Sequence, residues 1–319
     1  MTTSVATLIL AVAANLSVAL SQMAGAEAAE ARVEVATHEL TVGERPVPMR
    51  ILYRSGDKAR AVIILSHGTF SSGRKYDAVA RPWAARGYVV ILPDHRDADF
   101  GTVPRSVNDM MGIIESRVDD VRSIATALPS IAAALDQSAA DWASAPLYAA
   151  GHSVGTQVAM QVTGLQIRHP ETGAVTGYPE SRFDGAILLS DPGKMAAMPD
   201  HVWEAGNQPV FMATGPEDVG LMGDGRRDLG FENEVLMPAD ADDRYRVLLS
   251  IEGLDHQFGG LVQKETEGDP DHHALQLFVQ QSLQFLARCD ADSVAPAPGR
   301  LSDRAVVSVT AGRNGGRGC

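Results

Sequence analysis

Cysteine is scarce in this sequence, and the metal-binding spacings of histidine are missing. Cys289 and Cys319 are the only 2 cysteines in 319 residues, too few for a disulfide framework and far from any partner for metal or thiol catalysis. A single disulfide between them, holding the C-terminal end, remains open for an oxidising compartment. The 9 histidines form neither an H-x-x-x-H pair nor a cluster with cysteine. Segment 220–225 is a polar insertion rather than a phosphate-binding turn. From the histidine spacing and this segment together, we expect no metal and no other cofactor.

Positive charge is also in short supply. The chain has 27 lysine and arginine residues against 40 aspartate and glutamate residues, a formal net charge of −13. The phosphates of a nucleic acid or of an anionic membrane surface would repel such a chain, so we expect no nucleic-acid partner. Long apolar runs are missing after residue 20, which predicts a mature protein without an integral membrane segment. The sequence predicts no particular oligomeric state.

The N-terminal segment has the composition of a secretory signal. Residues 5–20 are apolar and are followed by small residues up to Ala29, a run too short for a clear membrane span. No lysine or arginine precedes Arg32, so the positive charge of a signal would come from the α-amino group alone. An amphipathic start of the domain or a misassigned start codon are the alternatives. We expect a signal peptide over residues 1–28 and a secreted or periplasmic protein.

Strand-like and helix-like segments alternate along the rest of the chain. The continuous apolar runs 61–65 and 88–92 are typical of parallel strands buried on both faces, and the helix-like segment 76–86 between them ends at Gly87. Further strands are predicted over 33–42, 46–54, 185–189, 209–214 and 245–251, and further helices over 118–135 and 273–289. This order predicts an α/β protein with a doubly wound, mostly parallel sheet of about eight strands flanked by helices, over residues 29–290. The Pro/Gly/Arg/Ser-rich segment 291–319 is expected to be a weakly ordered tail.

The most informative motif is Gly151-His152-Ser153-Val154-Gly155. It reads G-x-S-x-G and lies between an apolar strand and a helix-like segment, the setting in which this pattern forms a nucleophile elbow. A serine on such a tight turn adopts a strained conformation that projects its hydroxyl above the sheet edge, and the two glycines leave room for the turn. Ser153 is therefore the predicted nucleophile.

A serine needs a base and an orienting acid, and these are expected after it in the chain. His256 follows the strand 245–251 and precedes the last helix, so it is the leading base; the alternative is a surface-loop histidine. His272 and His273 are expected at the start of the final helix, facing solvent.

Two aspartates compete for the role of the acid. Asp218 follows the strand 209–214 and is favoured over Asp191, which follows the preceding strand and stands before a proline, as turn residues often do. Asp255 is expected to point away from the neighbouring His256.

An oxyanion hole needs two backbone N–H groups aimed at the developing negative charge. Val154, directly after the nucleophile, is expected to supply one. The loop Ser66-His67-Gly68-Thr69-Phe70 follows a predicted strand, and its glycine permits close approach of a substrate. Thr69 is expected to supply the second N–H. Phe70 and His152, next to these two donors, are the candidate substrate-binding residues.

These stretches together resemble a known family. The segments 64–68, 93–96, 151–155, 209–218 and 252–258 make the chain similar to serine α/β-hydrolases of the predicted dienelactone hydrolase group, and also to platelet-activating-factor acetylhydrolases and bacterial cutinases or polyester hydrolases. The resemblance covers residues 45–289 and implies the α/β-hydrolase fold. Relatives often have Ser-Pro-Pro-Gly where this chain has 190–193, which favours Asp218 over Asp191. True dienelactone hydrolases use a cysteine nucleophile, so that activity is not carried over to a chain with Ser153.

The segment between Ser190 and Pro209 holds 18 residues, which leaves no room for a large lid domain. Segments 97–116 and 165–183 are expected to form walls of the site, and Met195, Met198 and Trp203 are candidates for an acyl pocket or for ordinary core. The sequence therefore predicts hydrolysis of a small-molecule or polymeric carboxylic ester through an acyl-enzyme. The alternatives are hydrolysis of a lactone, amide or thioester on the same residues, and a non-catalytic ligand-binding protein on a hydrolase fold.

Overall fold

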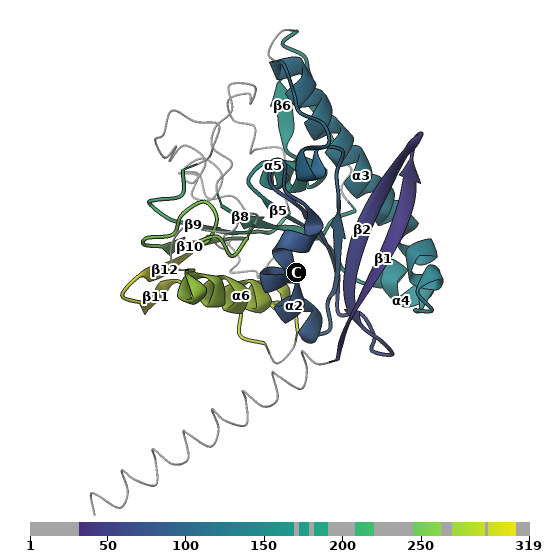
Figure 1. The fold of residues 1–319 in the computed structure, drawn as a ribbon. Helices are drawn as coiled ribbons and strands as arrows, with labels where there is room; N and C mark the ends of the chain where they lie inside the picture. Colours follow the sequence, from purple (N-terminus) through teal and green to yellow (C-terminus); the bar gives the residue numbers. More distant parts are fainter. Residues whose placement is uncertain are drawn as a thin grey trace, which may run out of the picture.

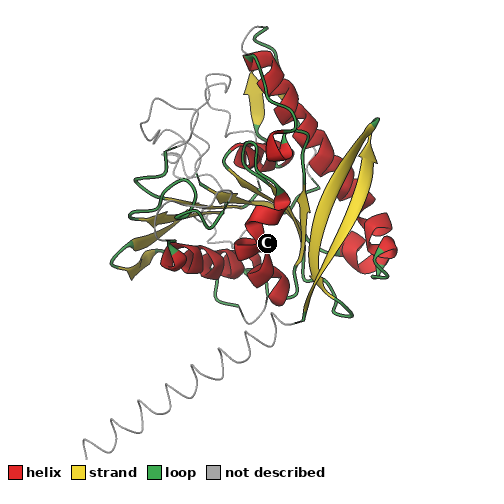
Figure 2. Ribbon diagram, viewed as in Figure 1, coloured by secondary structure: helices red, strands yellow, loops and turns green. Residues whose placement is uncertain are grey.

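The computed structural model describes residues 32–168, 172–178, 182–190, 208–219, 245–262, 270–290 and 293–310. Within these ranges, ten strands form one sheet in the order β1-β2-β4-β3-β5-β8-β9-β10-β12-β11. The strands β6 (Gln166–Arg168) and β7 (Val175–Gly177) form a separate antiparallel pair. Helices cover both faces of the large sheet, as Figure 1 and Figure 2 show. The sheet is therefore the frame on which the loops of the candidate site are placed.

Parallel strands occupy the centre of this sheet, and antiparallel strands occupy its two edges. The parallel set is β4 (Val89–Pro93), β3 (Val62–Ser66), β5 (Leu147–His152), β8 (Gly185–Leu189), β9 (Val210–Thr214) and β10 (Arg246–Ile251). The hairpin β1 (Val33–Val42) and β2 (Arg45–Arg54) lies next to β4, and β12 (Ala305–Thr310) with β11 (Gly299–Ser302) lies next to β10. Because the carboxyl ends of parallel strands share one edge, the loops after β3, β5, β9 and β10 meet there.

Both faces of the central strands are buried, which explains their continuous apolar runs. Along β3, Ile64 joins the core that also contains Val121 of α3 (Val107–Ala134), whereas Ile63 joins the core that contains Trp83 and Phe278. The first face is covered by α3 and α5 (Val154–Val162), and the second by α2 (Asp77–Ala85) and α6 (His272–Leu286). Alternating side chains thus build two separate cores from one strand.

The helix α3 begins eleven residues before the predicted start at residue 118. Ser106 caps it, because the side chain of Ser106 accepts a hydrogen bond from the N–H of Asp109 at 3.1 Å. The short helix α4 (Ala139–Ser144) and the 3₁₀ turns η1 (Gly73–Tyr76) and η2 (Ala98–Phe100) were not expected from the sequence. The early start of α3 brings its first turns beside the candidate site.

Two expectations about the sheet and its C-terminal end need correction. The described sheet has ten strands rather than about eight, because the predicted weakly ordered tail contributes β11 and β12. Ala305 and Val307 of β12 are buried in the core of the sheet. The prediction of a weakly ordered tail is therefore wrong over residues 299–310.

The turn between these two strands also contacts the neighbouring loop. Arg304 donates to the carbonyl oxygen of Glu252 at 2.9 Å and forms an ion pair with Asp271 at 2.7 Å. The N–H of Glu252 in return donates to the carbonyl oxygen of Arg304 at 2.7 Å. The C-terminal hairpin therefore fastens both ends of the segment that carries His256.

Several further expectations concern the ends of the chain. The predicted signal peptide, residues 1–28, and Cys319 lie outside the described residues. Cys289, after α6, is disulfide-bonded. Of the helices in the described ranges, none combines the length and the apolar character needed to cross a membrane.

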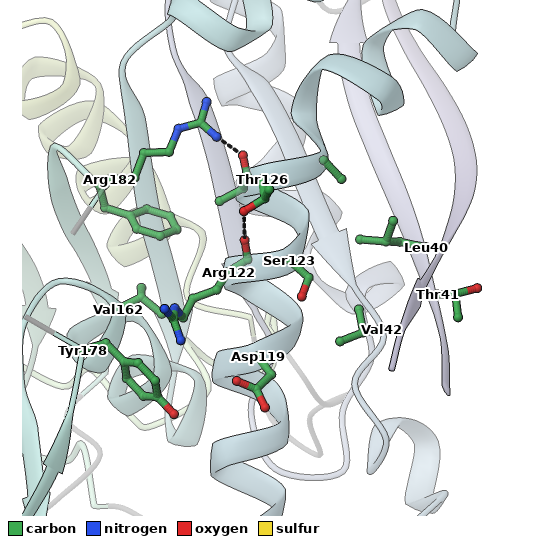
Figure 3. A pocket seen from close by; sticks show the side chains of 13 residues that line it. Leu40, Thr41, Val42, Asp119, Arg122, Ser123, Thr126, Val162, Tyr178 and Arg182 are labelled. Atoms are coloured by element: carbon green, nitrogen blue, oxygen red, sulfur yellow. Dashed lines mark hydrogen bonds between the residues drawn. The ribbon is translucent and has the colours of Figure 1, made fainter. Parts of the chain in front are cut away.

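A cavity of about 660 Å³ opens between α3, the end of β1 and the segment before β8 (Figure 3). Arg122 lies over the ring of Tyr178 there, with the guanidinium carbon 4.5 Å from the ring centroid. None of the predicted catalytic or oxyanion residues lines this cavity, although Tyr178, Arg182 and Phe183 do and belong to segment 165–183, which was expected to form a wall of the site. The candidate site is therefore elsewhere, at the carboxyl edge of the sheet.

Candidate active site

Ser153 occupies a strained turn between β5 and α5. Its φ and ψ angles are 55° and −122°, a combination that costs a non-glycine residue free energy and is found at nucleophile elbows. A Cβ atom on Gly151 would lie 1.9 Å from the carbonyl oxygen of Gly155, and one on Gly155 would lie 2.0 Å from that of Ser66. Both glycines are therefore required by close backbone contacts, as the motif predicts. The serine itself is 8% exposed.

His256 and Asp218 lie in contact on the loops after β10 and β9. The Nδ1 atom of His256 is 2.7 Å from Oδ1 of Asp218, within the distance expected of a base and its orienting acid. The other carboxylate oxygen of Asp218 accepts a hydrogen bond from the Thr214 hydroxyl at 2.8 Å. Since the carboxylate accepts, Nδ1 of His256 carries the proton, and Nε2 is left as the acceptor of the neutral ring.

The Nε2 atom of His256 has no hydrogen-bond partner in the described part of the chain, although it is buried. Buried polar atoms are nearly always paired, so an unpaired one asks for a functional explanation. A base that waits for a proton from a nucleophile has this property, because catalytic contacts are often long before substrate binds.

The backbone of His256 is tied to the elbow by two side chains. Its carbonyl oxygen accepts hydrogen bonds from Nε2 of His152 at 2.6 Å and from the hydroxyl of Ser190 at 3.0 Å. The other ring nitrogen of His152 accepts from the hydroxyl of Tyr76 at 3.0 Å, and that hydroxyl accepts from the N–H of Gly68 at 2.8 Å. A single chain of hydrogen bonds thus connects the loop of residues 66–70, called the oxyanion loop below, with the elbow and the loop that carries His256.

The expectation that His152 binds substrate is wrong. Its side chain is fully buried, and both ring nitrogens are engaged in the contacts just described. Its role is to hold the parts of the site together. Sequence reasoning placed it beside the nucleophile correctly but had no measure of its burial, and it missed Ser190 and Tyr76 altogether.

The two expected oxyanion donors lie on neighbouring elements. Val154 is the first residue of α5, so its N–H has no acceptor within the helix. The close approach of Gly155 to the carbonyl oxygens of Ser66 and His67 places the loop with Thr69 beside the start of this helix. Met111 and Ile114 of α3 pack against Val154. The structure thus places Val154 and the loop that carries Thr69 next to each other.

Phe70 is half-buried and stacks on Phe100, with ring centroids 5.1 Å apart and ring planes at 22°. Phe100 is 67% exposed. Both residues have positive φ angles, 57° and 65°, which are rare for bulky side chains. An aromatic surface next to the oxyanion loop is consistent with substrate binding by Phe70, and it lies where segment 97–116 was expected to form a wall.

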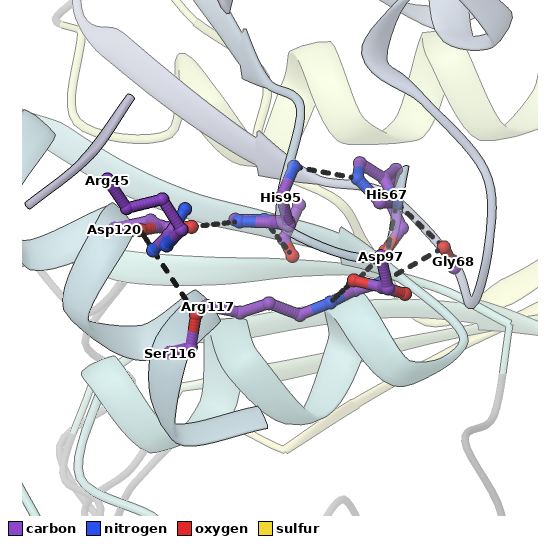
Figure 4. Close-up of polar contacts among 9 residues, drawn as sticks. Arg45, His67, Gly68, His95, Asp97, Ser116, Arg117 and Asp120 are labelled. Carbon is purple, nitrogen blue, oxygen red and sulfur yellow. Dashed lines mark hydrogen bonds and ion pairs between the residues drawn. The ribbon is translucent and has the colours of Figure 1, made fainter. Parts of the chain in front are cut away.

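A buried polar network lies behind the oxyanion loop (Figure 4). Arg117 of α3 is fully buried and forms a two-pronged ion pair with Asp97, at 2.9 and 2.6 Å. It also donates to the carbonyl oxygens of His67 and Gly68. The Nδ1–H of His67 donates to the carbonyl oxygen of Gly68 at 2.7 Å, and its Nε2 accepts from the N–H of His95 at 3.1 Å. The motifs at residues 66–68 and 93–96 were noticed in the sequence, but this role was not.

Burial and charge set the protonation of this network. Burial, followed by the charge of Arg117, holds the pKa of His67 well below its usual range, and burial lowers the pKa of His95. For Asp97, burial alone would raise the pKa, but the adjacent Arg117 guanidinium outweighs it and lowers the pKa to about 2. The network therefore contains two neutral imidazoles, one carboxylate and one guanidinium beneath the loop.

His95 also belongs to a second serine–histidine–aspartate chain. Its Nε2 is 2.9 Å from the hydroxyl of Ser66, and its Nδ1 is 2.8 Å from Asp120. Arg45 forms an ion pair with the same carboxylate and bonds to Ser116 at 3.2 Å. Ser66, His95 and Asp120 are each at most 2% exposed, so this chain has no access to a substrate.

The remaining candidates fall into three groups. Asp191, Met195, Met198 and Trp203 lie outside the described residues. The carboxylate of Asp255 accepts from the backbone N–H groups of Gln257 and Gly259, not from the His256 ring. His272 and His273 begin α6 and are exposed, as expected. Among the described residues, no group of three or more histidine, cysteine, aspartate or glutamate side chains is placed to hold a metal ion.

Comparison with known proteins bears on the fold. A family model described as serine aminopeptidase S33 (Hydrolase_4) matches residues 57–190, from before β3 to the end of β8. This match includes Ser153 and the oxyanion loop but neither His256 nor Asp218. A search of curated proteins found no match.

Solved structures give the same result over more of the chain. A ferulic acid esterase from Streptomyces cinnamoneus is 16% identical, with a TM-score of 0.56, and the match covers 87% of this chain and 96% of that one. Esterase 2 of Thermogutta terrifontis, phosphorylated by paraoxon, is 19% identical, with a TM-score of 0.54 and coverage of 83% and 96%. A candidate dienelactone hydrolase from Klebsiella pneumoniae subsp. pneumoniae is 13% identical, with a TM-score of 0.54 and coverage of 80% and 99%. The chain has the α/β-hydrolase fold, as the sequence predicted.

Proposed function

We propose that this protein is a serine hydrolase that cleaves carboxylic esters through an acyl-enzyme. One observation carries the proposal: His256 is held by Asp218 at 2.7 Å, while its other ring nitrogen is buried and unpaired, on the sheet edge that also bears the strained Ser153. A nucleophile, a base and an orienting acid are the three parts that acyl transfer by serine requires.

The chemistry follows from these positions. Ser153 Oγ attacks the ester carbonyl carbon while its proton passes to Nε2 of His256, and Asp218 stabilises the resulting imidazolium. The N–H groups of Val154 and Thr69 bind the oxyanion. The tetrahedral intermediate then expels the alcohol, which takes the proton from His256. Water, activated by the same imidazole, hydrolyses the acyl-enzyme and regenerates Ser153.

The aromatic pair Phe70–Phe100 supports an ester with an apolar or aromatic group next to the carbonyl. Its exposure suits small-molecule esters and the surface of a polymeric ester alike. The similar structures include a ferulic acid esterase and other esterases, which agrees with this substrate class. The closer likeness to platelet-activating-factor acetylhydrolases and cutinases remains a prediction of the sequence.

We further propose that the protein is exported, by a signal peptide over residues 1–28, to a secreted or periplasmic location. The disulfide at Cys289 supports this, because disulfides persist in oxidising compartments.

The strongest alternative is hydrolysis of an amide on the same residues, favoured by the description of the matching family as a serine aminopeptidase. Nucleophile, base and oxyanion donors would serve either reaction. A panel of p-nitrophenyl esters beside matched p-nitroanilides separates the two, and we expect the esters to be turned over faster. Faster turnover of the anilides would reverse the assignment.

Labelling with paraoxon tests the proposal as a whole. We expect one phosphoryl group per chain, on Ser153, with loss of ester hydrolysis in proportion to labelling. Ser153→Ala should be neither labelled nor active, whereas Ser66→Ala, which changes the buried serine, should still be labelled. An unlabelled wild-type protein without esterase activity would favour the ligand-binding alternative.

A further inference from the structure

We propose that Arg117, paired with Asp97, is a positioning residue for the oxyanion hole. It orients the Gly68–Thr69 peptide so that the N–H of Thr69 faces the carbonyl oxygen of the substrate. This inference rests on the proposed esterase function and adds a residue to it that lies outside the triad and does not touch the substrate.

The contacts of Arg117 are divided between Asp97 and the oxyanion loop. Two guanidinium nitrogens bind the carboxylate of Asp97, at 2.9 and 2.6 Å. The carbonyl oxygen of Gly68 accepts three hydrogen bonds: from Nη2 of Arg117 at 3.2 Å, from Nδ1–H of His67 at 2.7 Å and from the N–H of Ser71 at 3.2 Å. The carbonyl oxygen of His67 accepts a hydrogen bond from Nη1 of Arg117. Three donors on one carbonyl fix the direction of that peptide.

Peptide geometry converts this anchoring into an orientation of Thr69. The described chain contains no cis peptide bond, so the Gly68 C=O and the Thr69 N–H belong to one planar trans unit and point in opposite directions. With the C=O held toward Arg117, the N–H is directed away from α3. The elbow lies close by, because Gly155 contacts the carbonyl oxygens of Ser66 and His67.

Asp97 holds the other side of the same residue. Its Oδ2 atom accepts from the N–H of Phe70 at 3.2 Å, so the ion pair fixes the peptide before Thr69 through Arg117 and the peptide after it through the carboxylate. Phe70 also has a positive φ of 57°, which a bulky residue adopts only where its surroundings impose it. Both dihedral angles of Thr69 are therefore restrained by one buried ion pair.

Stability alone does not explain why two charges are buried here. Arg117 is 0% and Asp97 1% exposed, and a buried ion pair is often no more stabilising than apolar side chains of similar volume. A planar guanidinium has five N–H donors and can bind both carboxylate oxygens and two carbonyl oxygens at once, whereas an ammonium group has only three donors. Preorganised donors at an oxyanion are the setting in which such fixed geometry increases the rate.

The test compares Arg117→Lys with the matched variant Arg45→Lys. Lysine at 117 keeps a positive charge beside Asp97 but has too few donors for the two carboxylate and two carbonyl contacts of Arg117. Arg45 pairs with Asp120 in the adjoining Ser66–His95–Asp120 chain, and none of its hydrogen bonds is to a carbonyl of the loop. Each full-length protein is first titrated with paraoxon to count folded sites. Then kcat and KM for a p-nitrophenyl ester, the pH profile of kcat/KM and the inhibition constant of an arylboronic acid are measured. Boronic acids form a tetrahedral adduct with the serine, so their affinity reports on the oxyanion hole.

For Arg117→Lys we expect kcat to fall on the order of a hundredfold, the cost of a donor displaced by about 1 Å. KM should change little, the pH profile should keep its shape, and the boronic acid should bind more weakly by a similar factor. Arg45→Lys should match wild type in all four measurements. Boronic acid affinity of Arg117→Lys equal to that of wild type, or an equal loss in Arg45→Lys, would overturn the inference.

A second variant covers the case in which Arg117→Lys does not fold. Asp97→Asn leaves Arg117 in place and removes the charge that aligns it. We therefore expect smaller losses of kcat and of boronic acid affinity than in Arg117→Lys, again with little change in KM. Wild-type boronic acid affinity in Asp97→Asn would then overturn the inference. A failure of the esterase proposal is distinguishable, because wild type itself would then be neither labelled nor active.

Discussion

In the buried chain Ser66–His95–Asp120 both ring nitrogens of the imidazole are hydrogen-bonded, at 2.9 Å to Ser66 and 2.8 Å to Asp120. In Ser153–His256–Asp218 only the aspartate side is occupied, at 2.7 Å. Ser66 ends a regular strand and is 1% exposed, whereas Ser153 stands on a turn with φ of 55° and is 8% exposed. Residue types and contact lengths are nearly the same in the two chains. What separates the buried chain from the one that we propose to be reactive is access, backbone strain and an imidazole nitrogen left open.

The largest effect expected from this comparison is at the two serines. Ser153→Ala should lower kcat on the order of a millionfold and change the free energy of unfolding by well under ~1 kcal/mol, since the elbow keeps its glycines. Ser66→Ala should do the opposite: it leaves a buried imidazole nitrogen unpaired, at a cost of about 1–3 kcal/mol, and retains the triad. Ester turnover and urea unfolding of both variants measure this contrast. If Ser66→Ala were the inactive, stable variant, the assignment of the two chains would be reversed.

The two aspartates give the next largest difference. Asp218→Asn should cost on the order of ten-thousandfold in kcat, because the amide leaves His256 in the wrong tautomer. Asp120→Asn should leave kcat within about tenfold and lower stability by about 1–3 kcal/mol, through the loss of charge opposite Arg45. Steady-state kinetics and thermal unfolding of each variant provide the check. A nearly active Asp218→Asn enzyme would return the role of the acid to another residue, with Asp191 the first to examine.

The smallest expected effect is on the pH dependence of stability. His67 and His95 have lowered pKa values because they are buried, and His67 also because it is beside Arg117. The unfolded chain binds protons at these positions below about pH 6.5, while the folded chain resists protonation. Their contribution is therefore fully present above that pH and is lost as the pH falls below it, by up to about 1.4 kcal/mol per pH unit and histidine. Urea unfolding at several pH values should show a smaller decline for His67→Gln, and an unchanged decline would contradict the assignment.

The sequence predicted the strands of the central sheet and the candidate site residues at its carboxyl edge. Runs such as 61–65 and 185–189 identified strands because burial on both faces leaves only apolar residues. Ser153, His256 and Asp218 could be predicted as site residues because a turn motif and chain order constrain them, and the structure brings His256 and Asp218 into contact. Ile63 and Ile64 could not be assigned to different cores, because a doubly buried strand shows no alternation.

Burial of polar residues was the information that the sequence did not contain. In the sequence alone, His152 and Ser66 look like reactive groups. Only the structure shows that the ring nitrogens of His152 and the hydroxyl of Ser66 are hydrogen-bonded within the protein. Arg117 and Asp120 sit three residues apart on the inward face of α3, a polar pair in an apolar stripe, and this signal was available. The tail was misjudged from its overall composition, although Ala305 and Val307 are buried and Val306 between them is exposed, which is the alternation of a strand with one face on the core.

The contacts of Arg304 have a consequence for the order in which the protein is made. Chain synthesis runs from the N-terminus, so the elbow, the oxyanion loop and β10 all leave the ribosome before the hairpin that fastens the His256 segment through Glu252 and Asp271. A nascent chain can thus assemble its nucleophile well before its base is held in place. Under the proposed function, the hydrolytic site would therefore be complete only after these two strands have joined the sheet.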